Sequence, residues 1–158
     1  MKKLALGLLL LAFSTASWAQ LADLKPHRPA NRDKCPVCGM FVYKYPDWTA
    51  QLVFPDGNRL YFDGVKDLMK FYLNPAQYKF TKARPETAAV YMTDYYALES
   101  IEGTRAFYVL GSDVFGPMGK ELIPFAREEE AREFMKDHKG KKILRFREIT
   151  PEILKALD

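Results

Sequence analysis

The 158-residue chain has few of the side chains from which zinc sites and haem sites are built, with only two cysteines and two histidines. A closed zinc site needs four ligands, and nothing in the spacing of His27 and His138 fixes both beside the cysteines. Covalent haem attachment needs a histidine directly after the second cysteine, and Gly39 occupies that position, which excludes a haem site of this kind. A Ser/His/Asp set, paired carboxylates and a glycine-rich phosphate loop are also missing, so we predict that the protein is not an enzyme.

A large excess of one charge and a second long apolar run are missing as well. With the lysines at positions 2 and 3 set aside, the chain has 22 basic and 20 acidic residues. This near balance gives no sign of nucleic-acid binding. Beyond the first apolar run, no segment is long enough to cross a bilayer, so we expect no transmembrane segment in the mature chain.

The first 19 residues predict a secretory signal peptide. They begin with two lysines, continue with an apolar run from Leu4 to Phe13, and end in the small-x-small sequence Ser17-Trp18-Ala19. We therefore expect a periplasmic protein whose mature chain starts at Gln20. No cysteine directly follows the apolar run, so a lipid anchor is not expected. Export places both cysteines in an oxidising compartment, where a free thiol pair needs a reason such as a bound metal.

Both cysteines lie in the hexapeptide Cys35-Pro-Val-Cys38-Gly-Met40. Two thiols and a thioether within six residues suit Cu(I), which prefers soft sulfur donors. The first interpretation is therefore a Cu(I) site with Cys35, Cys38 and Met40 as ligands. One alternative is a static disulfide with Met40 as core filler. Another is a thiol-disulfide oxidoreductase that uses the same pair, although the pair follows a Pro-rich arm and not the strand of a thioredoxin-like site.

The first half of the mature chain predicts an arm, a β-hairpin, a helix and a strand. The arm, residues 20–34, is polar and shows no periodicity. A Pro-Asp-Gly-Asn turn between two β-rich runs predicts the hairpin, and apolar residues at helical spacing predict the helix. The expected elements are strands over 48–54 and 59–62, a helix over 64–73, and a strand over 88–93.

The second half predicts the same order again. Its expected elements are strands over 104–110 and 120–125, a helix over 127–138, a strand over 142–146, and a short helix from Pro151. Residues 62–71 match residues 125–134 in the aromatic residues that bracket the helix, which indicates an internal duplication. The predicted fold class is α+β, with two related β-β-α-β modules packed together. We place the first module at 35–100 and the second at 101–158.

The predicted modules differ most at their hairpin turns. Residues 111–119 read as a long Gly/Pro-rich loop, well beyond the usual hairpin length. Met118 lies in this loop between Pro117 and Gly119, where there is little core to fill. We interpret Met118 as a further sulfur ligand that the loop brings over the cysteine turn as a lid. The alternative is an exposed methionine with no role.

The other polar candidates have simpler interpretations. Asp63 precedes the first helix and is expected to cap it. Asp94 and Asp113 are expected to be turn residues. His138 ends the second helix, where a cation is favourable, and it is also a possible nitrogen ligand for copper. His27, on the arm, is a weaker candidate.

Taken together, several short motifs resemble the NosL family. They are Cys35-Pro-x-Cys38-Gly-Met40, Phe62-Asp63-Gly64 before a helix, Tyr108-Val-x-Gly-Ser112, Gly116-Pro117-Met118-Gly119 and a Glu-Ile pair near the C-terminus. The resemblance covers about residues 33–149, and the motifs are specific in combination although each alone is weak.

The resemblance implies a function as well as a fold. NosL proteins are secreted or lipid-anchored accessory proteins of nitrous oxide reductase that bind Cu(I) and help to load that enzyme with metal. For this chain the resemblance implies a copper chaperone in which Cys38, Met40 and Met118 matter to the metal site. The implied partners are a copper-enzyme client, nitrous oxide reductase, and an upstream copper donor. The expected free periplasmic form departs from the many family members that carry a lipid-anchor cysteine.

Overall fold

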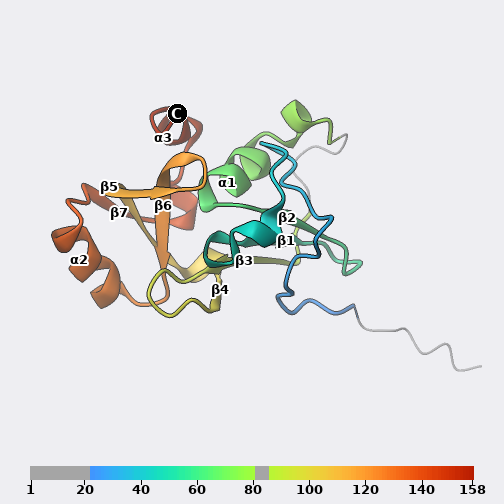
Figure 1. Ribbon diagram of the computed structural model, residues 1–158, viewed down its shortest axis with the longest axis horizontal. Coiled ribbons are helices and arrows are strands. Elements are labelled where there is room, and N and C mark those ends of the chain that lie inside the picture. Colours follow the sequence, from blue (N-terminus) through green and yellow to red (C-terminus); the bar gives the residue numbers. More distant parts are fainter. Residues whose placement is uncertain (1–21, 81–85) are drawn as a thin grey trace, which may run out of the picture.

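The computed structural model describes residues 22–80 and 86–158 and contains two antiparallel sheets (Figure 1). The first sheet has the order β2-β1-β3-β4 and the second the order β6-β5-β7. Their strands are β1 (Ala50–Val53), β2 (Arg59–Phe62), β3 (Ala89–Thr93), β4 (Ser100–Glu102), β5 (Phe107–Gly116), β6 (Gly119–Phe125) and β7 (Lys142–Arg145). The predicted signal peptide, 1–19, lies outside the described residues.

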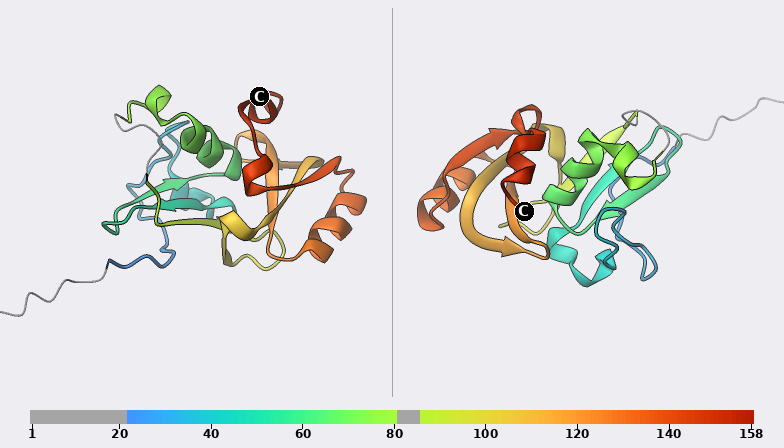
Figure 2. Two further views of the ribbon diagram at one scale, coloured as in Figure 1. Left: turned by 180° about the vertical axis from the view of Figure 1, so that it is seen from behind. Right: turned by 90° about the horizontal axis from the view of Figure 1, so that it is seen from above.

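Each sheet carries one longer helix after its first hairpin (Figure 2). The helices are α1 (Val65–Leu73), α2 (Glu128–Asp137) and the short α3 (Pro151–Lys155). The order β-β-α-β thus occurs twice, and the predicted α+β fold class is confirmed. In the part of the chain that the structure describes, no helix is long and apolar enough to cross a membrane.

The aromatic residues that bracket each helix form equivalent contacts in the two halves. Phe62 at the end of β2 meets Phe71 of α1 with ring centroids 5.5 Å apart. Phe125 at the end of β6 meets Phe134 of α2 with ring centroids 5.1 Å apart. In each case the helix lays an aromatic ring against the strand that leads into it, which buries both rings. The aromatic residues whose spacing indicated a duplication therefore have the same packing role in both halves of the chain.

The predicted strand over 48–54 is shorter in the structure, where β1 begins at Ala50. Trp48 lies in a short 3-10 helix that starts at Pro46, because proline fixes a backbone angle suited to a first helical position. All four residues of β1 are buried, so the strand is covered on both faces. The sequence did not predict β4, a three-residue strand that pairs with β3.

The prediction of a long loop over 111–119 is wrong. β5 continues to Gly116, and Gly116 pairs with Gly119, so that Pro117 and Met118 alone form the turn. The register shifts between Leu110 and Phe115, and Gly111 adopts a left-handed backbone (φ +80°) at this irregularity. A bulge-like irregularity of β5, in which four residues lie opposite residue 121 of β6, thus accounts for the glycine that suggested a loop.

Helix α1 joins the two halves of the protein. It packs against β1 and β2 of the first sheet and against β6 of the second. Its buried residues, such as Leu68, share one hydrophobic core with side chains of both sheets, among them Phe62, Tyr108 and Leu144. The start of α1, where the candidate site lies, is therefore held by elements from both halves.

Candidate metal centre

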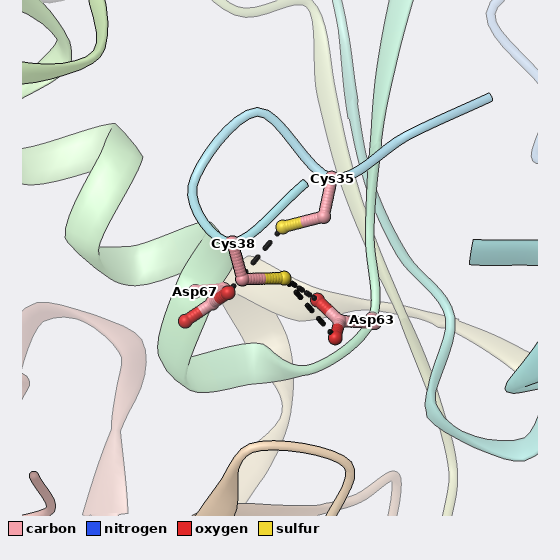
Figure 3. A group of neighbouring side chains, drawn as sticks. All are labelled: Cys35, Cys38, Asp63 and Asp67. Carbon is pink, nitrogen blue, oxygen red and sulfur yellow. Dashed lines mark hydrogen bonds between the residues drawn. The ribbon is translucent and has the colours of Figure 1, made fainter. Parts of the chain in front are cut away.

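Cys35 and Cys38 lie on a tight loop that closes on itself through two backbone hydrogen bonds. The amide of Cys35 donates to the carbonyl of Met40, and the amide of Gly39 donates to the carbonyl of Cys35, both at 2.9 Å. Gly39 has a φ of +79°, a left-handed conformation that glycine adopts without a steric penalty. The loop therefore turns back on itself within six residues and presents both thiols to the start of α1 (Figure 3).

Two aspartates from the start of α1 face these thiols (Figure 3). Cys38 Sγ donates to Asp63 Oδ1 at 3.2 Å, and Cys35 Sγ donates to Asp67 Oδ2 at 3.3 Å. Asp63 follows β2 directly and precedes the N-cap residue Gly64, whereas Asp67 lies in the first turn of α1, so the junction between strand and helix brings both carboxylates to the thiols. One ligand atom from each of the four residues lies within 4.8 Å of the others, and all but Cys38 are buried.

Both cysteines are free thiols in this structure, and their surroundings favour the neutral form. Burial, reinforced by the carboxylate of Asp63, raises the pKa of Cys38 to about 12. Burial also raises the pKa of Cys35 far above its usual range, and Asp67 adds to this effect. Catalytic thiols in disulfide exchange have lowered pKa values, because the thiolate is the nucleophile. The pair therefore lacks the electrostatic surroundings that the oxidoreductase alternative requires.

Asp63 does not cap α1 as predicted. Gly64 is the N-cap residue and no local side chain caps the helix, while both carboxylate oxygens of Asp63 accept from Cys38 Sγ. Glu121 of β6 takes the capping role, since its Oε1 accepts from the backbone amide of Lys66 at 2.6 Å. These partners are 55 residues apart, so a local sequence pattern does not reveal the cap.

The two predicted thioether ligands, Met40 and Met118, come from two different elements of the structure. Met40 ends the cysteine loop and is half-buried. Met118 is at the tip of the β5–β6 hairpin with 42% of its surface exposed, and its carbonyl accepts from Lys66 Nζ at 2.8 Å. The structure thus connects the backbone of Met118 to α1.

Neither histidine belongs to the cluster. His27 Nε2 lies 2.8 Å from Asp23 Oδ2 on the arm. His138 Nδ1 lies 3.2 Å from Asp113 Oδ1, and its ring stacks on Phe134 at the end of α2. Both imidazoles thus pair with nearby carboxylates at positions away from the thiols.

Sequence reasoning missed Asp63 and Asp67 as site residues. The available signal was the position of Asp67, which falls between Val65 and Leu68 on a short amphipathic helix and is buried with them. A carboxylate in such a position rarely stays buried without a partner. Together the two thiols and two carboxylates form a compact, mostly buried donor set of the kind that binds a metal ion.

Comparison with known proteins gives the family of this chain. The NosL family model matches residues 26–154. The chain is 29% identical over 140 residues to the copper-binding lipoprotein NosL of Stutzerimonas stutzeri, a match that covers 84% of this chain and 70% of the relative.

Solved structures give the same family. The fold is similar to the crystal structure of the copper chaperone NosL from Shewanella denitrificans, with a TM-score of 0.64 and 26% identity over 80% of this chain and 99% of that chain. The solution structure of the apo-NosL protein from Achromobacter cycloclastes matches with a TM-score of 0.48 and 25% identity, over 66% of this chain and 87% of that chain. Since the family model covers most of the sequence, from the arm to the last helix, this chain belongs to the NosL family.

Proposed function

We propose that this protein is a periplasmic copper chaperone that binds Cu(I) through Cys35 and Cys38 and delivers it to a copper enzyme. The observation that carries the proposal is the convergence of both thiols with Asp63 and Asp67 within 4.8 Å. Thiolates are soft donors that select Cu(I). In the metal-free protein the carboxylates orient the two thiols by accepting hydrogen bonds from them. The names of two relatives, a copper-binding lipoprotein and a copper chaperone, support the choice of metal.

Two methionines supply the remaining sulfur in this proposal. Met40 follows the cysteines on the same loop, and Met118 lies at the hairpin tip that Lys66 joins to α1. Thioether sulfur binds Cu(I) well and zinc poorly, so methionine ligands favour copper over its common competitor. The proposed ligand set is therefore Cys35, Cys38, Met40 and Met118.

The site is buried on one side and open on the other, which suits transfer. Cys35 and both aspartates are buried, whereas Cys38 is only half-buried and Met118 is 42% exposed. A partner protein can therefore approach the metal from the side of Cys38 and Met118. A copper ion held by few, partly exposed sulfurs is easily handed to another thiolate or imidazole.

We also propose a compartment and a client. The predicted leader at 1–19 supports export to the periplasm. The resemblance of the motifs to the NosL family implies nitrous oxide reductase as the enzyme that receives the copper. An upstream copper donor completes the route.

Anaerobic titration of the reduced mature protein with Cu(I), in competition with a Cu(I) chelator, tests the binding step. We expect one tightly bound Cu(I) per chain and weaker binding of Zn(II). Cys38→Ser should nearly abolish Cu(I) binding, whereas serine in place of the exposed Thr104 changes no donor and serves as a control. A tighter complex with zinc than with Cu(I) would contradict the proposal.

Transfer is tested separately with copper-free nitrous oxide reductase. The Cu(I)-loaded protein should restore more activity than the same amount of Cu(I) supplied with the Cys38→Ser variant. Equal restoration by the two would show that the copper reaches the enzyme without this protein.

A further inference from the structure

One buried residue of α1, Lys66, holds the tip of the β5–β6 hairpin through both its backbone and its side chain. Its backbone amide donates to Glu121 Oε1 at 2.6 Å, and its Nζ donates to the carbonyl of Met118 at 2.8 Å. Met118 is in the two-residue turn of the hairpin, and Glu121 lies on β6, which follows the turn. A single residue therefore fixes the hairpin at two points three positions apart, beside Asp67 in the first turn of α1.

The burial of Lys66 makes this contact costly to rearrange. Its side chain is only 3% exposed, and its ammonium also donates to the carbonyl of Leu157 and lies 3.7 Å from Asp158 Oδ1. A buried ammonium without such partners costs several kcal/mol in general, so the bonds to Met118 and Leu157 strongly favour one arrangement. Glu121, also buried, supplies an acidic group in the same region.

The fit around Glu121 is equally close. A Cβ atom at Gly64 would lie 2.2 Å from Glu121 Oε2, and a Cβ atom at Gly116 would lie 3.1 Å from Glu121 Cγ. Glycine at both positions lets the strand and the start of the helix approach until the carboxylate reaches the Lys66 amide. The hairpin and the first turn of α1 therefore form one rigid corner (Figures 1 and 2).

The same corner leaves the Met118 side chain available. Its carbonyl is held by Lys66, while 42% of the residue stays exposed. A methionine whose backbone is fixed and whose thioether is free is well suited to bind a metal ion, because a preorganised ligand loses less conformational entropy on binding.

We propose that Lys66 is a positioning residue that holds the Met118 thioether beside the Cys35–Cys38 loop and so raises the affinity of the site for Cu(I). This inference rests on the proposed function, with Met118 as a ligand. Lys66 touches no metal: it acts through the Met118 backbone. It makes the metal site a joint structure of the two halves of the fold.

A double-mutant cycle tests this role. Lys66→Leu keeps an apolar side chain, removes the ammonium donors and adds no sulfur, and we expect Cu(I) affinity to fall roughly tenfold, as for the loss of a residue that orients a ligand. In a Met118→Leu background the same substitution should cost nothing further. Copper X-ray absorption of Lys66→Leu should show one sulfur neighbour fewer than wild type. Lys155→Leu, at an exposed position of α3, is the matched control and should leave affinity and spectrum unchanged.

The outcomes separate this inference from the proposed function. Wild-type affinity in Lys66→Leu, or an equal loss in both backgrounds, overturns the positioning role while leaving copper binding intact. Failure of the wild-type protein to bind Cu(I) overturns both. If Lys66→Leu does not fold, as judged by circular dichroism, Lys66→Arg replaces it, because the longer, planar guanidinium shifts the Met118 carbonyl. The affinity loss with arginine must again depend on Met118, and a loss that does not depend on it overturns the proposal.

Discussion

Cys38 Sγ lies 3.2 Å from Asp63 Oδ1, although 25 residues of the chain separate them. The contact ties the cysteine loop to the corner between β2 and α1, and Cys35 and Asp67 repeat it one helix turn further on. Each sulfur is thus oriented by a carboxylate, and each carboxylate opposes loss of the thiol proton. The site therefore favours the neutral form of both thiols, and a bound cation would offset the negative charge and favour the thiolates.

Asp63→Asn should increase the reactivity of Cys38. Burial and the Asp63 carboxylate together raise the pKa of Cys38 to about 12, and asparagine removes the negative charge while keeping the shape. The pKa should fall, so more thiolate is present at mildly alkaline pH and alkylation by iodoacetamide is faster. Mass spectrometry of the modified Cys38 measures the rate. Asp47→Asn, at an exposed position, is the control, and equal rates in the two variants would mean that burial alone sets the pKa.

Loss of a thiol should outweigh loss of a thioether on the cysteine loop. Cys38→Ser should nearly abolish Cu(I) binding, whereas Met40→Leu should weaken it roughly ten- to a hundredfold, as for a supporting ligand. Leucine matches methionine in volume, so the loop, closed by the Cys35 amide on the Met40 carbonyl, should keep its shape. Chelator competition gives both affinities. Wild-type affinity in Met40→Leu would indicate that Met40 only packs against the fold.

Stability should fall as the pH rises towards the pKa of Glu121. Burial raises this pKa from 4.5 to about 8, against the opposing effect of the amides of Leu122 and Lys66. Below pH 4.5 the group is protonated in the folded and unfolded states alike. Between 4.5 and about 8 the unfolded chain releases the proton more readily, so the free energy of unfolding decreases, by a total on the order of 5 kcal/mol.

Glu121→Gln separates this effect from other titrations. Glutamine keeps an acceptor for the Lys66 amide and has no proton to release, so its urea unfolding curves should depend less on pH across the same window. Between pH 4.5 and about 8, the free energy of unfolding of wild type should therefore fall steadily relative to that of the variant. A constant difference would show that Glu121 titrates normally in the folded protein.

Local patterns were sufficient for most of the fold. Helical spacing identified α1 and α2, and the turn at 55–58 identified the β1–β2 hairpin, because each depends on neighbours in the chain. The segment 111–119 misled because glycine marks both loops and β-bulges. Which of these occurs depends on the strand beside it, and that strand, here β6 beside Leu110 and Phe115, is fixed by the tertiary fold.

The site was only partly predictable for the same reason. Cys35 and Cys38 carry a local signal, two thiols three residues apart, that needs no tertiary information. Asp63 also had a local interpretation, as a helix cap, which was wrong because Glu121 reaches the amide of Lys66 from the other sheet. Once the cap comes from elsewhere, the Asp63 carboxylate is free to accept from Cys38.

Met118, the hairpin-tip residue proposed as a ligand, should contribute to copper binding and not to the stability of the fold. Met118→Leu should lower Cu(I) affinity roughly tenfold and remove one sulfur neighbour from the copper X-ray absorption spectrum. The side chain is 42% exposed, so the apo-protein should keep its free energy of unfolding within about 0.5 kcal/mol of wild type. The backbone contact with Lys66 Nζ does not depend on the side chain, so the hairpin tip should stay in place.

Met69→Leu is the matched control for this prediction, since Met69 is 1% exposed in the core on α1. The same change of side chain there should alter the free energy of unfolding by up to about 1.5 kcal/mol and leave copper binding unchanged. Met118→Leu should therefore change Cu(I) affinity and not stability, whereas Met69→Leu should change stability and not Cu(I) affinity. If Met118→Leu instead lowers stability and leaves affinity and spectrum unchanged, the Met118 side chain is a packing residue. The copper would then be held by the first half of the chain alone.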